Sequence, residues 1–408
     1  MRWALGTLAF LVSVAFWPGA PSFAELPKWA TFGVGVAVLS CFTRIRPTPA
    51  HWWLLAVLLY AAASITWSVV PWDGLGGLCK LTFLAAAFCL GAEQEDLTPV
   101  YVGAGMGIAV SAVVATLQWR GYPVAEQVIG PAGLYGNKNF MGEAAALAMV
   151  ALALSPVRTW WLLPTAAFAL WLSGSRGGVA GVAVAGISWL ARRAPVTAFA
   201  VAVIGAVAVA DLARTANVWR LTAIGERTVI WADTLDGMTW FGRGIGSFYT
   251  AMPEHGPRLS LVLHERTMHA HSDILELVFE LGVGACGFAA LLALALACPR
   301  ERERLVLAAF VVAGLTGFPL YEPSTALLAA IVAGYLCGLG HRLRHAVVCG
   351  GTHDDGVATL RGPLYHQAVW PAQRRPDFSA RSLHPVAAGL CAAVERAIDR
   401  AGIRAGGG

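Results

Sequence analysis

Two histidines close a polar stretch that comes directly before a long apolar run. His269 and His271 are followed by Ser272, Asp273 and Glu276. Asp273 with Glu276 three residues later is typical of a helix N-terminus with a reciprocal capping acid. His271 would then lie just ahead of the positive end of a helix, which attracts anions and favours a neutral imidazole. Such a histidine can act as a general base, or it can simply hydrogen-bond the helix end.

Two arginines have sequence contexts that suit an anionic ligand. Arg176 follows Ser173-Gly174-Ser175 and opens an apolar run, where the backbone N–H groups of a helix start also attract anions. Arg227 shares a helical spacing with Trp231 inside a long polar stretch. A guanidinium pressed toward an apolar side needs a partner such as a carboxylate or a phosphate. The plainer interpretation is an interfacial arginine that reaches the lipid headgroups.

A third cation, Lys138, stands between Asn137 and Asn139 at the start of another apolar run. Either asparagine can cap the helix that follows. Lys138 can contact a phosphate of a substrate or the phosphates of the bilayer. We add Arg220, from the same long polar stretch as Arg227, to the candidate donor-binding cations.

Two acids continue along the apolar run that follows His271. Glu276 and Glu280 are four residues apart, so they share one face of a helix. Ionisable residues inside membrane spans usually face the bundle interior and mark a site. The alternative is that Glu276 lies shallow enough in the run to be solvated, whereas Glu280 lies deeper and is harder to explain in this way.

A metal site is the alternative for the histidine-rich stretch. It would use His264, Glu265, His269 and His271, which fall within eight residues. Their spacing matches no zinc pattern. We therefore expect no metal and no other cofactor.

The composition shows which elements must position these residues. Of 408 residues, 57% are hydrophobic and 13% are charged, whereas a soluble domain carries about 25% charged residues. A helix needs about 20 mostly apolar residues to cross a bilayer. Such runs lie at roughly 4–23, 29–43, 52–69, 74–92, 99–117, 139–154, 159–173, 177–191, 195–212, 272–298, 304–319 and 324–340. They predict an all-α fold, a polytopic membrane bundle of about twelve transmembrane helices over residues 1–340.

Charges in the short loops predict the orientation of this bundle. One set of alternate loops and ends holds Arg2, Arg44, Arg46, Arg158, Arg192, Arg193, Arg300, Arg302, Arg304, Arg342 and Arg344. The opposite set holds Lys28, Arg120, Lys138 and Arg176. Because short cytoplasmic loops are rich in Lys and Arg, both termini should be cytoplasmic.

This orientation places two long polar stretches, 118–138 and 213–270, on the outer side. The second is the large periplasmic loop within the bundle, and its helical spacing argues against disorder. Residues 341–408 form a cytoplasmic tail. The first apolar run, followed by Ser22-Phe23-Ala24, also fits a cleavable signal peptide. The net charge of +5 reports topology, and no basic stripe with interleaved aromatics predicts nucleic-acid binding.

Four segments in this order resemble the superfamily of O-antigen ligases and O-antigen polymerases. They are Gly136-Asn137-Lys138-Asn139, then Ser173–Gly177, then Arg227–Asp233 running on to Phe241–Phe248, and finally His269–Ser272 followed after nine residues by Gly282. Together they fall within residues 130–325. Ser272 stands where many members have Asn, and Ala285 stands where the ligase pattern has Gly, Thr or Tyr.

The resemblance implies an inverting, metal-independent glycosyl transfer at the periplasmic face of a bacterial inner membrane. The donor would be a glycan on undecaprenyl diphosphate, and the acceptor a hydroxyl of a glycolipid or glycan. His271 would take the acceptor's proton, while Arg176 and Arg227 would stabilise the leaving diphosphate. Lys138 and Arg220 would assist donor binding. The supporting residues would be Asn137, Asn139, His269, Glu276 and Glu280.

Four functions remain open at this point, and the acceptor separates the first three. A ligase joins a finished glycan to a lipid acceptor, a polymerase joins one carrier-linked repeat to another, and a related enzyme glycosylates protein. The fourth is a transporter of a lipid or sugar. Transporters tend to carry paired internal repeats, which this sequence does not show, so we expect a ligase-like enzyme first and a polymerase second.

Overall fold

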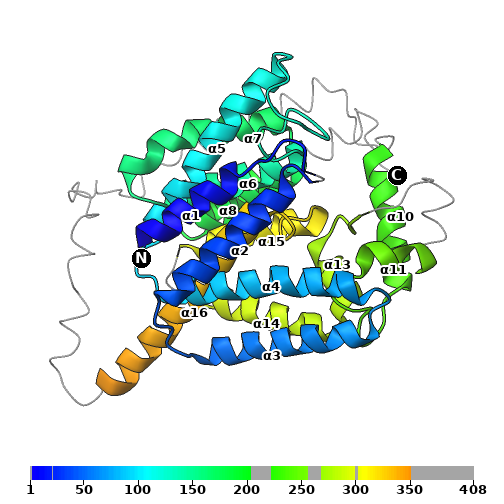
Figure 1. Ribbon diagram of the computed structural model, residues 1–408. Coiled ribbons are helices and arrows are strands. Elements are labelled where there is room, and N and C mark those ends of the chain that lie inside the picture. The colour runs from blue at the N-terminus through cyan, green and yellow to red at the C-terminus, as the bar shows by residue number, and fades with distance from the viewer. Residues whose placement is uncertain (1, 21, 204–221, 256–267, 299–301, 351–408) are drawn as a thin grey trace, which may run out of the picture. The chain divides into compact units, whose positions relative to one another are not determined.

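The computed structural model describes residues 2–20, 22–203, 222–255, 268–298 and 302–350, and all regular elements in these ranges are helices (Figure 1). The chain divides into two units, Met1–His345 and Ala346–Gly408, and the site lies in the first. Arg220, His264 and Glu265 lie outside the described residues, as do parts of the predicted periplasmic loop and most of the predicted tail.

The helices follow the apolar runs closely. They are α1 (Arg2–Val14), α2 (Glu25–Cys41), α3 (Pro49–Ser64), α4 (Pro71–Ala92), α5 (Thr98–Trp119), α6 (Lys138–Leu154), α7 (Leu163–Ser173), α8 (Arg176–Ala191), α10 (Thr222–Asp236), α11 (Phe248–His255), α13 (Asp273–Leu281), α14 (Ala285–Leu296), α15 (Arg304–Thr316) and α16 (Pro323–Gly350). Three predicted spans differ: the helix in the first run ends at Val14, the run at 159–173 begins with a 3-10 segment (Val157–Leu162), and the run at 272–298 forms two helices. The second half of the predicted run 195–212 lies outside the described residues.

Five described segments are long and apolar enough to cross a membrane. They are Pro49–Trp67, Pro71–Ala92, Thr98–Trp119, Asp273–Leu296 and Pro323–Arg342. Helices α1, α8 and α15 are apolar but shorter. The all-α class and the presence of membrane helices are thus confirmed, while the count of twelve spans stays a prediction.

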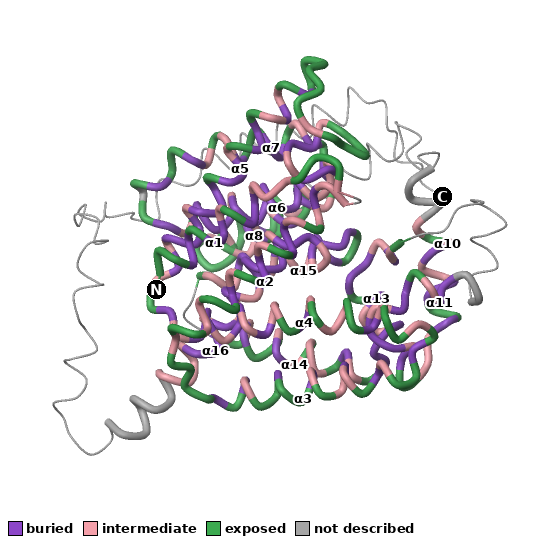
Figure 2. Tube along the Cα trace, in the orientation of Figure 1, coloured by how far each residue is buried: buried purple, intermediate pink, exposed green. Residues whose placement is uncertain are grey.

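The helices of the first unit pack through small residues. Helices α3, α4 and α14 run side by side, α1 lies along α5, and α6 packs against α7, α8 and α15 (Figure 1). A Cβ placed on Gly103 of α5 would come within 1.9 Å of the carbonyl oxygen of Gly6 in α1. Close approach of this kind is typical of membrane helices. Figure 2 shows that α6 is mostly buried, whereas α3 has a largely exposed outer face.

Exposed tryptophans lie near helix ends throughout the described part of the chain. They include Trp3, Trp52, Trp53, Trp67, Trp72, Trp119, Trp160, Trp161, Trp171 and Trp189. Tryptophan is enriched at both membrane–water interfaces, where its ring is half in the apolar region. This placement agrees with a bundle that spans a bilayer.

The helix ends with the predicted cytoplasmic arginines contact one another. An Arg2 Nη1 atom lies 3.9 Å from Oδ2 of Asp96, which precedes α5. Arg342 of α16 donates to the carbonyl of Ala92 at 2.9 Å, at the end of α4. Arg192, which follows α8, is close enough to Arg304, the first residue of α15, for the two positive charges to repel each other. Because α8 begins and α15 ends at the candidate site, these arginines lie at the helix ends away from it.

The break between α13 and α14 is built on glycines. Gly282 has a φ of 53°, and a Cβ there would lie 2.2 Å from the carbonyl oxygen of Trp240. The N–H groups of Arg243 and Gly244 donate to the carbonyls of Phe279 and Glu280, both at 2.9 Å. The segment 240–246, which we call the glycine turn, is therefore a tight turn against the end of α13.

Candidate active site

The segment Thr316–Glu322, which joins α15 to α16, brings the predicted site residues together. We call it the hub segment. The ring of Phe318 lies edge-on to Phe140 of α6, with centroids 4.9 Å apart. The same ring stacks on His269 at 4.8 Å and meets His271 at 5.1 Å. The starts of α6 and α13 and the end of α15 therefore converge here.

The backbone just before His271 is fixed from two sides. Glu276 Oε2 accepts the N–H of Ala270 at 2.8 Å. Trp231 of α10 donates its indole N–H to the Ala270 carbonyl at 2.9 Å. His271 itself has a φ of 52°, the only positive φ among the described non-glycine residues. Strain of this kind costs about 1–3 kcal/mol and persists where the surroundings hold it, often at functional sites.

His269 has a different environment from His271. Its Nδ1 lies 2.9 Å from Oε1 of Glu276, and its ring packs between Phe318 and Tyr321. Glu276 is buried and uses one oxygen for this ring and the other for the backbone of Ala270. The pair thus holds the shape of the His269–His271 segment.

The surroundings of the His271 imidazole favour its neutral, basic form. Burial, the positive charge of Arg227 and the neighbouring His269 lower its pKa from 6.5 to about 4. Its Nδ1 is buried and has no hydrogen-bond partner among the described residues. At neutral pH the imidazole therefore carries no charge, and it can accept a proton from a substrate hydroxyl.

Two arginines lie close to each other at the site. Arg227 of α10 donates to the carbonyl of Thr316 at 2.7 Å. Its pKa is lowered by burial and by Arg176, while Glu143 acts in the opposite direction. Arg176 is the exposed first residue of α8, and Ser175 caps that helix by accepting the N–H of Gly178 at 3.2 Å. Among the described residues Arg227 thus donates to a backbone carbonyl and interacts electrostatically with the Glu143 carboxylate, and a phosphate partner stays a prediction.

The prediction that Asp273 caps α13 and that Glu276 is its reciprocal capping acid was wrong. The N-cap is Ser272, which makes no side-chain cap bond. Asp273 instead accepts the N–H of Leu320 at 2.9 Å, in the hub segment. Glu276 turns back to His269 and Ala270. Each acid finds an N–H group from outside the helix, so neither is available to its own first turn.

The Asn137–Asn139 segment begins α6, as the sequence predicted. Asn137 is the N-cap and accepts the N–H of Asn139 at 2.9 Å. The backbone of Lys138 donates to the carbonyl of Ile129 at 2.8 Å, within the 118–138 segment. It is Phe140, two residues on from Lys138, that contacts the hub segment.

Glu280 supports the glycine turn. Its buried carboxylate accepts the N–H of Phe248 at 3.1 Å, at the start of α11. Helices α10, α11 and α13 pack against one another around Phe248 and Phe279, whose ring centroids are 5.2 Å apart. Glu280 therefore connects α13 to the segment that carries Arg227 and Trp231.

Sequence reasoning missed Glu143 and the hub segment. Glu143 is a buried acid of α6, and a Cβ on Gly317 would lie 2.2 Å from its Oε1. The signal was present, because Glu143 is an ionisable residue inside an apolar run, like Glu276. Phe318 gave no such signal, because an aromatic residue in an apolar stretch is ordinary.

A second buried polar cluster was missed behind the hub segment. Lys28, which we counted only for topology, is buried and donates to the carbonyl of Ser13 at 2.7 Å. Its ammonium lies 4.5 Å from the ring centroid of Tyr135. Burial raises the pKa of Glu322, and the charge of Lys28 opposes that shift. Lys28 thus stabilises the end of α1 in the interior.

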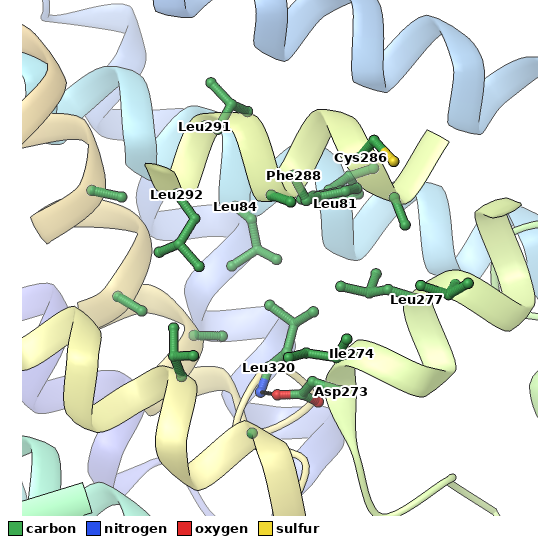
Figure 3. A pocket seen from close by; sticks show the side chains of 18 of the residues that line it. Leu81, Leu84, Asp273, Ile274, Leu277, Cys286, Phe288, Leu291, Leu292 and Leu320 are labelled. Atoms are coloured by element: carbon green, nitrogen blue, oxygen red, sulfur yellow. Dashed lines mark hydrogen bonds between the residues drawn. The ribbon is translucent and has the colours of Figure 1, made fainter. Parts of the chain in front are cut away.

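An apolar cavity of about 730 Å³ adjoins the start of α13. Figure 3 shows Leu277, Phe288 and Leu292 around it, with Asp273 and its hydrogen bond to Leu320 at the edge. Its walls come from α3, α4, α13, α14, α15 and α16. Asp273, two residues after His271, is thus part of both the cavity wall and the site.

Residues 144–288 match the family model Wzy_C, described as O-Antigen ligase. The matched range runs from α6 to α14 and includes Arg176, Arg227 and His271. No curated protein matches the chain. The matched range contains three of the four motifs, and Gly136–Asn139 precedes it. The match supports the resemblance to the O-antigen ligase superfamily and a membrane glycosyltransferase-like function. Over residues 144–288 the chain is therefore similar to the O-antigen ligase family.

Proposed function

We propose that this chain transfers a glycan from undecaprenyl diphosphate to an acceptor hydroxyl, as an O-antigen ligase-like enzyme of the bacterial inner membrane. The observation that carries the proposal is the placement of a neutral histidine and two arginines around one hub segment. His271 meets Phe318, and Arg227 binds the carbonyl of Thr316, two residues earlier in the chain.

In the proposed reaction His271 accepts the proton of the acceptor hydroxyl. The acceptor oxygen forms a bond to the anomeric carbon while the bond from that carbon to the diphosphate breaks, so the anomeric configuration inverts. Arg176 and Arg227 stabilise the negative charge on the leaving diphosphate, which is usually the largest contribution to such catalysis. Burial and the positive charge of Arg227 lower the pKa of His271 and so keep it in the basic form.

The apolar cavity supports a lipid-linked substrate. Its lining is almost entirely aliphatic and aromatic, and it is of a size typical of ligand pockets. A lipid chain placed there would leave its polar end near Asp273 and His271. The glycan and the diphosphate would then extend toward the arginines.

The runner-up is a polymerase, which uses the same donor and the same base but takes a second carrier-linked glycan as acceptor. Further alternatives are a protein O-oligosaccharyltransferase and a lipid or sugar transporter. The products that accumulate in cells separate these possibilities.

The test uses cells that lack the endogenous gene and express wild type, His271→Ala or Arg227→Ala at equal levels. Arg120→Ala is the control, because Arg120 is an exposed arginine that packs on Trp119 at the end of α5. Envelope glycans are then separated on a gel. Full-length but unattached carrier-linked glycan in both site variants supports the ligase, and accumulated single repeats support the polymerase. Wild-type patterns in both variants would remove the catalytic assignment and favour transport.

A further inference from the structure

Glu143 lies at the meeting point of three helices and the hub segment. It belongs to α6, and its residue is only 3% exposed. A Cβ on Gly317 would lie 2.2 Å from its Oε1, and a Cβ on Gly177 of α8 would lie 3.7 Å away. The same added Cβ on Gly177 would be 3.6 Å from Oγ1 of Thr316, the last residue of α15. The carboxylate therefore faces the small gap between these backbones.

One oxygen of this carboxylate is left without a partner. Oε2 of Glu143 is buried and has no hydrogen bond among the described residues. Buried polar atoms in folded proteins are almost always hydrogen-bonded, so an exception calls for a missing partner. A carboxylate oxygen accepts hydrogen bonds, so the missing partner is an O–H or N–H group.

The neighbours of Glu143 are the groups that would act on the donor. Gly317, which its side chain touches, is followed by Phe318, which contacts His271. Gly317 is preceded by Thr316, whose carbonyl binds Arg227. Gly177 is next to Arg176 in sequence. Glu143 thus lies beside two glycines, Gly317 and Gly177, whose chain neighbours contact or include the base and the cations.

In an inverting transfer the acceptor and the diphosphate lie on opposite faces of the donor sugar. The sugar must therefore lie between His271 and the arginines, in reach of a residue placed where Glu143 is. The oxygens of the diphosphate are unsuitable partners for Oε2 of Glu143, because they are themselves hydrogen-bond acceptors. A sugar hydroxyl, or the N–H of an acetamido group, is suitable.

We propose that Glu143 accepts a hydrogen bond from a hydroxyl or amide N–H of the sugar attached to the diphosphate. It then distinguishes glycan-bearing carrier lipid from bare carrier lipid. The bare diphosphate leaves Oε2 of Glu143 without a partner, whereas the glycosylated one supplies a hydrogen bond to it. This inference rests on the proposed function, since it takes the donor to be a lipid diphosphate.

The test measures binding to the full-length chain in detergent. Two probes are used: undecaprenyl diphosphate without sugar, and the carrier-linked glycan isolated from cells without the transferase. Glu143→Leu removes the acceptor, and Glu143→Gln keeps the shape but removes the charge. Size-exclusion profiles and thermal unfolding check that both variants are folded.

For Glu143→Leu we expect the glycan-bearing lipid to bind roughly 10- to 100-fold more weakly, the usual loss for a hydrogen bond to a charged group. We expect the bare lipid to bind unchanged, because it has no sugar to donate a hydrogen bond to Glu143. Glu143→Gln should lie between wild type and Glu143→Leu for the glycan-bearing lipid. A purely structural role would weaken both probes together.

Equal weakening of both probes, or no change in either, would overturn the role of Glu143. The proposed function fails separately, when wild type binds neither probe or when His271→Ala transfers glycan at the wild-type rate. Suppose that wild type is active, His271→Ala is inactive and both Glu143 variants bind as wild type does. Only the role of Glu143 in sugar recognition would then be removed.

Discussion

The candidate base is defined by its backbone as much as by its ring. His271 has a left-handed φ of 52°, which side chains rarely adopt. The preceding residue, Ala270, is held at its N–H by Glu276 and at its carbonyl by Trp231. Because these two contacts come from different helices, the position of the imidazole depends on how α10 packs against α13.

The pH dependence of transfer should report the environment of His271. A base is active when deprotonated, and a pKa of about 4 keeps it so at all higher pH. The profile of kcat/KM should be flat from neutral pH down to about pH 5 and fall at lower pH. Arg227→Gln removes a positive charge that lowers this pKa, so the acid limb should move up toward the ordinary value of 6.5. Arg120→Gln should leave the limb in place, and an unmoved limb in Arg227→Gln would contradict the assignment.

Trp231→Phe tests the hydrogen bond that holds the carbonyl of Ala270. Phenylalanine keeps much of the packing but cannot donate to the Ala270 carbonyl. Loss of one ordinary hydrogen bond, about 1 kcal/mol, predicts a fall of about fivefold in kcat/KM. The matched control is Trp72→Phe, since Trp72 is 79% exposed at the start of α4. Equal kinetics in the two variants would show that the indole N–H does not position the base.

At the scale of elements, the site depends on how helix ends are joined. The hub segment contacts α6 through Phe140, α10 through Arg227 and α13 through Asp273. The glycine turn holds the far end of α13, where Gly282 separates α13 from α14. These connections are short and irregular, and they fix the relative positions of the helices that carry the candidate site residues.

Gly282→Ala should strongly destabilise the chain. The positive φ at this position costs about 1–3 kcal/mol for a residue with a Cβ, and the new methyl would also meet the Trp240 carbonyl at 2.2 Å. Gly76→Ala is the control, because nothing lies within 4 Å of its added Cβ and alanine favours a helix. Thermal unfolding in detergent should show a lower Tm for Gly282→Ala and an unchanged or higher Tm for Gly76→Ala. Similar Tm values would contradict the turn described here.

The sequence predicted elements better than their junctions. Apolar runs gave the helices, and the helical spacing of Arg227 and Trp231 gave α10, because periodicity is a local property. The N-cap pattern at Asp273 and Glu276 failed, since both acids bind N–H groups supplied by the fold. Phe318 and Glu143 join the site only through long-range packing, which one sequence does not display.

At the scale of the whole molecule, the two sets of helix ends have different characters. One set carries arginines that contact neighbouring helix ends, as Arg342 does at the end of α4. The other set carries His271, Arg176 and the buried acids around the hub segment. The proposed donor is presented at one face of the membrane only, so the proposed reaction requires the candidate site to lie at that face.

The topology predicts which positions a membrane-impermeant thiol reagent reaches. In a variant without its native cysteines, Glu126→Cys should be labelled in intact spheroplasts, because residue 126 lies in the predicted outer segment 118–138. Arg192→Cys should be labelled only after the membrane is opened, because residue 192 lies on the predicted cytoplasmic side. The reverse labelling would place the candidate site on the cytoplasmic face and contradict the proposed reaction.

The central claim is that His271 removes the proton of the acceptor. Its most direct test is single-turnover transfer by purified full-length chain, with carrier-linked glycan as donor and donor binding measured in the same samples. We expect His271→Ala to bind the donor about as well as wild type and to transfer it about 10²–10⁴ times more slowly, the usual contribution of a general base. Transfer by His271→Ala at close to the wild-type rate, with the same donor binding, would show that another group is the base.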